Sequence, residues 1–370
     1  MRFLVITLAP SLHKESAIYS YAPYVKEMNL WFDKVEKPVI LSPTKYKKKL
    51  LTSSFDNSNI EVVSIPSIYG GSILGLLKSA LVLPSIFFKM MVQMKRADHI
   101  HLRCPSNIGL IGCFVQVLFP KKIKTAKYAG NWDPKAIQPL SYRLQKWILA
   151  NTFLTKNMNV LVYGDWPNQS KNIKSFFTAS YTKKEIIGTP PKVFKAPYKF
   201  LFVGSLVSGK RPLYAIKLIE SLVKSGTQCT LELYGDGVER AILETYVLDH
   251  QLNNVIKFRG NKAAAEVQQA YKDSSFLILP SKSEGWPKVV AEAMFWGVIP
   301  IVTHISCVPW MLDFGARGIL MSTIKQQDLA VLLEQLEYPK KLQEMSNKAK
   351  QWSQEYTLDT FEAEILKLLK

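Results

Sequence analysis

Several features that would mark a protein's class are scarce or missing in this 370-residue chain. It has only four cysteines, and their wide spacing argues against a disulfide framework and a cysteine metal site. They are Cys104, Cys113, Cys229 and Cys307. No low-complexity tract occurs, and no uncharged run reaches the roughly 20 apolar residues that a membrane-spanning helix needs. We expect a folded cytoplasmic protein whose cysteines are small buried side chains.

The N-terminal run offers no secretory signal either. Residues 1–8 are apolar but short, and Ala9-Pro10 follows directly. This pattern predicts a first buried strand rather than a signal peptide.

Acidic residues are scarce in the first half of the chain. Residues 1–190 hold 26 Lys and Arg against 10 Asp and Glu, which gives +16 of the total charge of +19. The basic clusters are Lys45 with Lys47, Lys48 and Lys49, then Lys95 with Arg96, then Lys121, Lys122, Lys124 and Lys127. A one-sided basic domain suits an anionic partner such as membrane lipid, a lipid-linked phosphate or nucleic acid. A solvated basic face that aids solubility explains the charge equally well.

The segment 71–96 is rich in Leu, Ile, Phe and Met, with few lysines. It is compatible with an amphipathic helix lying on a membrane. A helix packed in the core or lining a groove is the alternative that we favour slightly.

Strands and helices alternate along the first half, which predicts a parallel sheet covered on both faces. The expected strands are 3–8, 38–42, 60–65, 99–102, 124–128 and 159–163, and the expected helices are 22–31, 72–95, 108–118 and 142–152. Residues 183–197 break the alternation with Gly188, three prolines and several lysines, so they form the best linker candidate.

The alternation resumes after this linker. The expected strands are 200–203, 230–234, 255–258, 276–279 and 298–302, and helices are expected at 212–224, 238–251, 263–272, 284–296, 327–337, 341–355 and 358–369. We predict a first domain at 1–187, a second at 188–355 and a C-terminal helix at 356–370 that packs back on the first domain. The predicted fold is α/β, with two tandem doubly wound, Rossmann-like sheets and a cleft between them.

Glu284 and Glu292 lie eight residues apart in the run SEGWPKVVAEAMFWG, after an apolar strand. Eight residues are a little over two helical turns, so the two carboxylates can share one face. Glu284 would lie in the loop where the helix begins and Glu292 about two turns inside it. The free N–H groups and positive dipole at a helix start favour anions, so this arrangement suits a nucleotide sugar. Because apolar residues surround Glu292, we expect its carboxylate to be partly buried and paired.

Five segments in order carry a family resemblance: VGSLVSGK, LELYGDG, VIKFRG, SFLILPSKSEGWPKVVAEAM and WGVIPIV. In this order and spacing, residues 198–322 resemble the donor-binding domain of retaining glycosyltransferase family 4, whose fold is called GT-B. The first half resembles that family only in its β–α pattern, as expected for the acceptor side.

The resemblance implies roles for the donor-binding residues. The loop 204–210 would hold the donor diphosphate, with Lys210 as its cation, and Arg211 would substitute for an arginine that many members have where this chain has Ser205. Glu284 would face the transferred sugar and Glu292 the ribose. The donor-binding set is Gly204, Ser205, Lys210, Arg211, Arg259, Gly285, Trp286, Lys288, Val289 and Glu292. Arg259 is equally compatible with a surface arginine, and Trp286 with a core aromatic, whereas the glycines of Gly235-Asp-Gly237 serve backbone geometry.

Catalytic and acceptor-side residues are harder to place. Many family members carry a histidine where alignment on DHIHLRCP puts Arg103, and His101 lies two residues earlier on the same strand face. The catalytic candidates are therefore Glu284, Arg103 and His101, although a packed strand histidine is the favoured alternative for His101. The acceptor-side candidates lie in two expected loop ends, and they are His13, Asn131, Trp132 and Asp133.

The resemblance implies a hexosyltransferase-type enzyme that moves a sugar, with retention, from a UDP- or GDP-type sugar to a saccharide acceptor. A lipid-linked acceptor in surface polysaccharide or lipopolysaccharide assembly is expected, together with peripheral contact with the anionic inner face of the cell membrane. No cofactor, metal or nucleic acid is implied, since no Asp-x-Asp motif occurs and Lys210 with a helix terminus can offset the diphosphate charge. The alternatives are an epimerase of the same fold and a non-enzymatic basic protein that binds lipid or nucleic acid.

Overall fold

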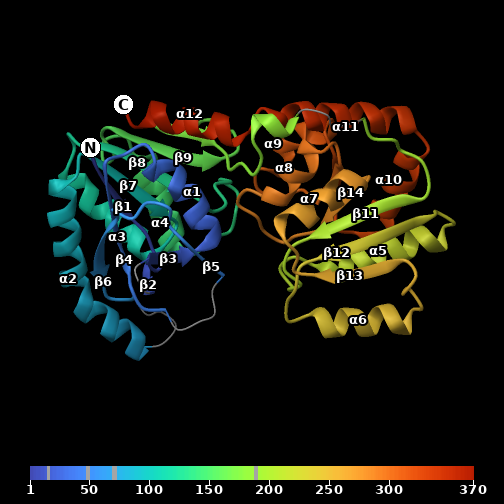
Figure 1. The fold of residues 1–370 in the computed structure, drawn as a ribbon, viewed down its shortest axis with the longest axis horizontal. Coiled ribbons are helices and arrows are strands. Elements are labelled where there is room, and N and C mark those ends of the chain that lie inside the picture. Colours follow the sequence, from blue (N-terminus) through green and yellow to red (C-terminus); the bar gives the residue numbers. More distant parts are fainter. Residues whose placement is uncertain (15–16, 47–50, 69–72, 187–190) are drawn as a thin grey trace. The chain divides into compact units, whose positions relative to one another are not determined.

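The computed structural model describes residues 1–14, 17–46, 51–68, 73–186 and 191–370 (Figure 1). The chain forms two compact units, Met1–Phe176 together with Glu362–Lys370, and Phe177–Phe361. The sequence-based boundaries at 187 and 355 stay predictions, and the compact units change at Phe176 and Phe361 instead. Within the expected linker, residues 187–190 lie outside the described part, as do Lys47, Lys48 and Lys49 of the first basic cluster.

The first unit is built on a seven-stranded parallel sheet in the order β10-β9-β8-β7-β1-β4-β6. Its strands are β1 (Arg2–Ile6), β4 (Lys37–Pro43), β6 (Glu61–Ile65), β7 (His99–Cys104), β8 (Ile123–Tyr128), β9 (Met158–Tyr163) and β10 (Ile173–Phe176). The helical elements are α1 (Ala22–Phe32), α2 (Ile73–Arg96), α3 (Asn107–Val115), η1 (Gln116–Leu118) and α4 (Leu140–Ala150). The strand order reverses between β1 and β7, where crevices form at the carboxyl ends of such sheets.

The core of this unit explains why the apolar runs became strands and helices. Buried side chains such as Ile86, Met90 and Met94 of α2 pack against the strands together with residues of α3 and α4. The core-packed alternative for 71–96 therefore holds for the buried face of α2. Figure 1 shows α2 at one margin of the first unit.

A small antiparallel sheet in the first unit was not expected. It pairs β2 (Leu12–Lys14) with β3 (Ala17–Tyr21), and β3 with β5 (Thr52–Ser54). The prediction that His13 lies in a loop end is thus wrong, since His13 is an exposed residue of β2. Strands of three to five residues with mixed polar and apolar side chains have too little periodicity to be recognised in a sequence.

The second unit holds a six-stranded parallel sheet in the order β13-β12-β11-β14-β15-β16. Its strands are β11 (Tyr198–Val203), β12 (Cys229–Tyr234), β13 (Ile256–Gly260), β14 (Phe276–Leu279), β15 (Ile299–Thr303) and β16 (Ile319–Met321). Its helical elements are η2 (Lys183–Ile186), α5 (Pro212–Lys224), α6 (Arg240–Asp249), α7 (Ala264–Asp273), α8 (Lys288–Phe295), α9 (Val308–Met311), η3 (Asp313–Gly315), α10 (Lys325–Leu336) and α11 (Pro339–Gln354). The last helix, α12 (Leu358–Leu368), contributes its residues from Glu362 on to the first unit.

Two expectations about side chains are confirmed here. Pro212 occupies the first turn of α5, where its missing N–H needs no partner. All four cysteines are buried and free.

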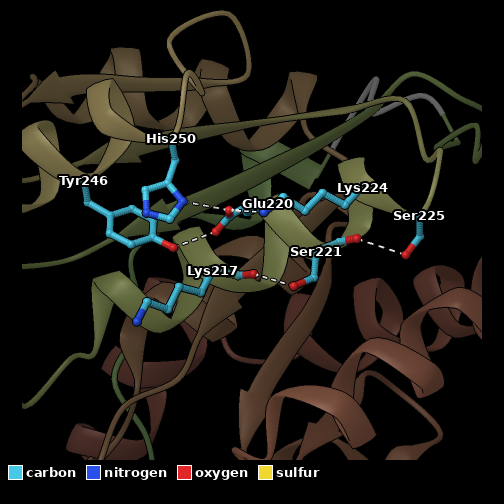
Figure 2. Close-up of polar contacts among 7 residues, drawn as sticks. All are labelled: Lys217, Glu220, Ser221, Lys224, Ser225, Tyr246 and His250. Atoms are coloured by element: carbon cyan, nitrogen blue, oxygen red, sulfur yellow. Dashed lines mark hydrogen bonds and ion pairs between the residues drawn. The ribbon is translucent and has the colours of Figure 1, made fainter.

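A polar cluster ties α5 to α6 on the second unit (Figure 2). The Glu220 carboxylate accepts hydrogen bonds from Tyr246 at 2.6 Å and Lys224 at 2.6 Å, and its Oε1 lies 2.8 Å from His250 Nδ1. Burial alone would raise the pKa of Glu220, but these hydrogen bonds outweigh it and lower the pKa to about 2. The carboxylate is therefore a charged link between the two helices at neutral pH.

No helix in the described part of the chain has both the length and the apolar character that a bilayer crossing requires.

Candidate functional site

The strand order of the second sheet reverses between β11 and β14, which pair side by side. In open parallel sheets, ligands bind at the carboxyl ends of the strands at such a reversal. The loop after β11 contains residues 204–211 and the loop after β14 contains residues 280–287. Both predicted donor-binding segments therefore meet at the switch point of one sheet.

Backbone contacts hold the first of these loops in place. The Gly204 N–H donates to the Tyr234 carbonyl at 2.9 Å, and the Leu206 N–H donates to the Asp236 carbonyl at 3.0 Å. Gly235 has a φ of +133°, and a Cβ added there would lie 2.0 Å from the Gly204 carbonyl oxygen. The prediction that the glycines of Gly235-Asp-Gly237 serve backbone geometry is confirmed, because no side chain fits against the first loop at Gly235.

The two loops also contact each other directly. The Lys282 N–H donates to the Gly209 carbonyl at 2.8 Å. Beside this bond, Lys210 Nζ donates to the Glu284 carboxylate, with side chains 30% and 10% exposed. The structure thus joins the cation predicted for the diphosphate to the carboxylate predicted for the sugar. Arg211 follows as the left-handed N-cap residue of α5, and Ser205 is exposed.

Glu284 does not lie on the helix that carries Glu292. Helix α8 begins at Lys288, with Pro287 as its N-cap residue, so Glu284 lies in the loop before the helix, as expected. The helix starts later than the predicted residue 284, however, and the two carboxylates therefore do not share a helical face. The physical reason is the Trp286-Pro287 pair, since a residue before proline is steered away from helical backbone angles. Glu292 consequently lies in the second turn of the helix, and Lys288 and Val289 occupy its first two positions.

The carboxylate of Glu292 is partly buried and paired, as expected. Its Oε1 accepts a hydrogen bond from the Ser180 hydroxyl, and its Oε2 accepts one from the Tyr271 hydroxyl at 3.1 Å. The Tyr271 side chain is fully buried, which is the main cause of the strong rise in its pKa. Neither partner is recognisable in the sequence, because Ser180 precedes the linker and Tyr271 of α7 belongs to no motif. A carboxylate has about four acceptor positions, so two hydroxyl partners leave room for further donors.

The loop before α8 is fixed from a third strand. The Gly285 carbonyl accepts hydrogen bonds from Ser306 Oγ at 3.3 Å and Cys307 Sγ at 3.1 Å, in the segment after β15. Burial raises the pKa of Cys307 to about 12, so its thiol stays protonated and can donate. The sequence identified Cys307 only as a small buried side chain and did not reveal this contact.

Trp286 is almost fully buried, at 8% exposure. Its ring lies 6.2 Å from that of Trp352 and 6.4 Å from that of Trp310, measured between centroids. These contacts favour the interpretation of Trp286 as a core aromatic over a sugar-stacking surface. The cluster anchors the loop that carries Glu284 to the body of the second unit.

Arg259 of β13 contacts the neighbouring strand β12. Its guanidinium donates to Glu232 of β12 at 2.5 Å, and its side chain is 42% exposed. This pairing favours the alternative of a surface arginine.

In the first unit, His101 and Arg103 lie on β7, at the point where the strand order reverses. The His101 ring is fully buried against Trp31, with centroids 4.8 Å apart, and its Nδ1 lies 2.8 Å from the Thr125 hydroxyl. Burial, reinforced by the charge of Arg103, lowers the pKa of His101 well below its ordinary value, so the ring is neutral. This environment favours the packed strand histidine over a catalytic role.

Arg103 forms an ion pair with Glu27 of α1. Burial alone would lower the pKa of Arg103, but Glu27 raises it above its ordinary value. Lys127 of β8 lies 3.9 Å from the same carboxylate, and its burial lowers its pKa to about 8. Two cations therefore flank one carboxylate at the carboxyl ends of β7 and β8.

The segment 131–133 follows β8 and is held by local bonds. Trp132 is 2% exposed, and its Nε1 donates to Gln169 at 2.9 Å, so the side chain belongs to the core. Asn131 Oδ1 accepts from the Asp133 N–H at 2.9 Å, which closes a turn. Asp133 lies in the loop before α4, which begins at Leu140.

Comparison with solved structures shows the fold. The lipopolysaccharide outer core galactosyltransferase WaaB is 14% identical, with a TM-score of 0.69 over 100% of this chain and 99% of that one. Anabaena Alr3699/HepE, solved with UDP and glucose, is also 14% identical, with a TM-score of 0.64 over 100% and 99% of the two chains. The protein is thus an α/β protein of GT-B fold, as predicted.

Comparison with sequences finds a family match in the second half of the chain. Residues 184–352 match the family described as Glycosyl transferases group 1. An uncharacterized glycosyltransferase of Haemophilus influenzae is 30% identical over 165 residues, 43% of this chain and 45% of the relative. The putative colanic acid biosynthesis glycosyltransferase WcaL of Salmonella typhimurium is 29% identical over 143 residues, 37% and 35% of the two chains. The chain thus matches well under two thirds of these relatives' length.

Proposed function

We propose that this protein transfers a hexose-type sugar from a nucleoside diphosphate sugar to a saccharide acceptor, with retention of the anomeric configuration. The observation that carries the proposal is the Lys210–Glu284 pair at the β11/β14 switch point, together with Glu292 on α8, the helix that follows the Glu284 loop. One cation and two carboxylates in this order match the charges of a diphosphate and the hydroxyl groups of a sugar and a ribose.

In the proposed site, Lys210 and the first N–H groups of α8 stabilise the leaving diphosphate as negative charge develops on it. Glu284 orients the transferred sugar through its hydroxyl groups, and Glu292 accepts hydrogen bonds from the ribose. Catalysis then depends on positioning and on stabilising the leaving group, without a metal ion or cofactor. Arg211 offers a second cation at the start of α5.

Related proteins support an acceptor in polysaccharide assembly. Besides WcaL, the matches include the amylovoran biosynthesis glycosyltransferase AmsK of Erwinia amylovora, which is 27% identical over 146 residues. By analogy with these proteins and with WaaB, we propose a lipid-linked saccharide acceptor and a cytoplasmic site of action. UDP is the nucleotide to test first, because HepE was solved with it.

A thermal-shift screen of UDP- and GDP-sugars tests donor binding directly, since a ligand that binds only the folded state raises the stability of the protein. Binding of at least one nucleotide sugar, followed by acceptor-dependent release of UDP or GDP that EDTA does not suppress, is the expected result. Donor turnover with solvent hydrogen exchange into the sugar, and without any acceptor, would instead identify the epimerase. Absence of binding by every nucleotide sugar would overturn the proposal.

A further inference from the structure

Helix α2 presents apolar side chains to both the core and the solvent. Its inward residues Ile86 and Met90 are fully buried. Leu81 and Phe88 are 82% and 62% exposed, and they lie seven residues apart, which is close to two full turns. At about 100° per residue, Ile86 and Met90 lie about 160° round the helix from Phe88. The helix therefore has a second apolar face that points away from its own unit.

Cations line one flank of this outer face. Lys78, Lys89 and Arg96 are exposed, and their spacing of eleven and seven residues places them on nearly the same side of the helix. The sequence between Glu61 and Asp98 contains no acidic residue at all. An exposed apolar stripe beside a row of cations is typical of a helix that lies in the headgroup region of an anionic membrane.

A basic groove adjoins the same flank. It has a volume of about 610 Å³, and its lining combines Lys45, Lys78 and Lys89 with hydroxyl-bearing residues and with apolar residues such as Leu81 and Val82. Lys89 Nζ donates to the Ser64 carbonyl at 2.8 Å, which fixes one of the three cations at the groove wall. The Thr44 and Ser64 hydroxyls hydrogen-bond to each other at 2.8 Å, so the three ammonium groups are the main donors for a phosphate group.

We propose that the outer face of α2 and this groove form a docking site for anionic phospholipid. Leu81 and Phe88 enter the interfacial region of the bilayer, while Lys78 and Lys89 contact headgroup phosphates on one side. A partner protein would need a complementary acidic surface with its own apolar patch, whereas an anionic bilayer supplies both components over any area. The inference names a partner for the proposed transferase but does not require sugar transfer, because vesicle binding is measured without donor or acceptor.

Co-sedimentation of the full chain with vesicles tests this site. The vesicles are pure phosphatidylcholine, or equal parts of phosphatidylcholine and phosphatidylglycerol. Two double variants are used: L81S/F88S removes the apolar side chains that would insert, and K78Q/K89Q removes two cations of the flank. The matched controls are L140S/W147S, at side chains of α4 that are 77% and 61% exposed, and K340Q/K348Q, at exposed lysines of α11. Thermal unfolding checks that each variant is folded.

The wild type is expected to bind the phosphatidylglycerol vesicles at least about tenfold more strongly than phosphatidylcholine, and added salt should weaken this binding. Each α2 variant should lose about tenfold or more of that binding, and both controls should retain it. A wild type that binds neither vesicle, or an L140S/W147S control that loses as much as L81S/F88S, overturns the proposal. Sedimentation velocity adds a further test, because a wild-type dimer that L81S/F88S converts to monomer would make the face a contact between copies instead.

Discussion

Lys210 and Glu284 form an ion pair between the loops that follow neighbouring strands β11 and β14. The two residues are 74 positions apart in the chain, and each was assigned a different part of the donor from the sequence. Their contact makes them one electrostatic unit, so substitutions at the two positions should not be additive.

Replacing Lys210 by alanine should weaken the binding of UDP. The variant loses a charge-assisted hydrogen bond to the diphosphate, and such a loss corresponds to roughly tenfold to hundredfold in affinity. Isothermal titration calorimetry measures the effect. Lys282→Ala is the control, because Lys282 is a neighbouring lysine whose ammonium lies 3.3 Å from the Ser208 hydroxyl. Equal losses in the two variants would mean that only general positive charge matters.

Replacing Glu284 by glutamine should separate nucleotide binding from sugar transfer. UDP lacks the transferred sugar, so it does not need Glu284, and removal of the carboxylate charge frees Lys210 for the phosphates. We expect E284Q to bind UDP at least as tightly as the wild type while kcat/KM for transfer falls by about tenfold or more. The idea fails if E284Q transfers sugar at the wild-type rate.

Replacing Glu292 by glutamine should mainly impair donor use. The amide keeps the shape but lacks the charge that strengthens hydrogen bonds from ribose hydroxyls, so the donor KM should rise roughly tenfold or more. S180A and Y271F, which each remove one partner of this carboxylate, should give smaller increases. The exposed Glu344→Gln on α11 serves as control. A donor KM that is the same in E292Q and in the control would remove Glu292 from the site.

Much of the fold was predictable because buried parallel strands and their crossover helices have strong apolar patterns. Phe276–Leu279, for example, is a fully buried run of four, and it formed β14 as expected. The hairpin strand β2 and the edge strand β10 were missed, since each is short and partly exposed. Spatial pairing, rather than local pattern, stabilises such strands.

The candidate site was predictable where glycines and charged residues form a recognisable pattern. It was not predictable where burial determines whether a side chain can reach a ligand. Lys210 and Glu284 were both named, but their contact depends on the order of strands in the sheet. Trp132 and Trp286 were candidates for the acceptor and donor sides of the site, yet both are buried. A tryptophan beside a loop looks the same in a sequence whether it faces solvent or the core, because neither local spacing nor composition reports tertiary packing.

Replacing Gly235 by alanine should destabilise the second unit and disturb the loop after β11. The new Cβ would lie 2.0 Å from the Gly204 carbonyl oxygen, so the backbone must move. We expect a loss of roughly 3 kcal/mol or more in the free energy of unfolding by urea, together with weaker UDP binding. Gly226→Ala is the matched control, because Gly226 also has a positive φ, of +87°, but no atom lies within 4 Å of the added Cβ. The free energy of unfolding of this control should fall by only roughly 1–2 kcal/mol, the cost of backbone strain alone.

The Glu220 cluster between α5 and α6 should make the stability of the second unit depend on pH. Burial alone would raise the pKa of Glu220, but hydrogen bonds from Lys224, Tyr246 and His250 outweigh it and lower the pKa to about 2. A depressed carboxyl pKa adds stability that is complete above its unfolded-state pKa of about 4.3 and disappears as the pH falls toward 2.

E220Q should therefore be less stable than the wild type by about 1–3 kcal/mol at neutral pH, and the two should converge between about pH 4.3 and pH 2. Urea unfolding across this range measures the difference. Glu244→Gln is the control, because that carboxylate forms only a half-exposed pair with Arg240 on α6 and should change stability little. A difference between E220Q and the wild type that stays constant down to pH 2 would show that the carboxylate charge is not the source of the stabilisation.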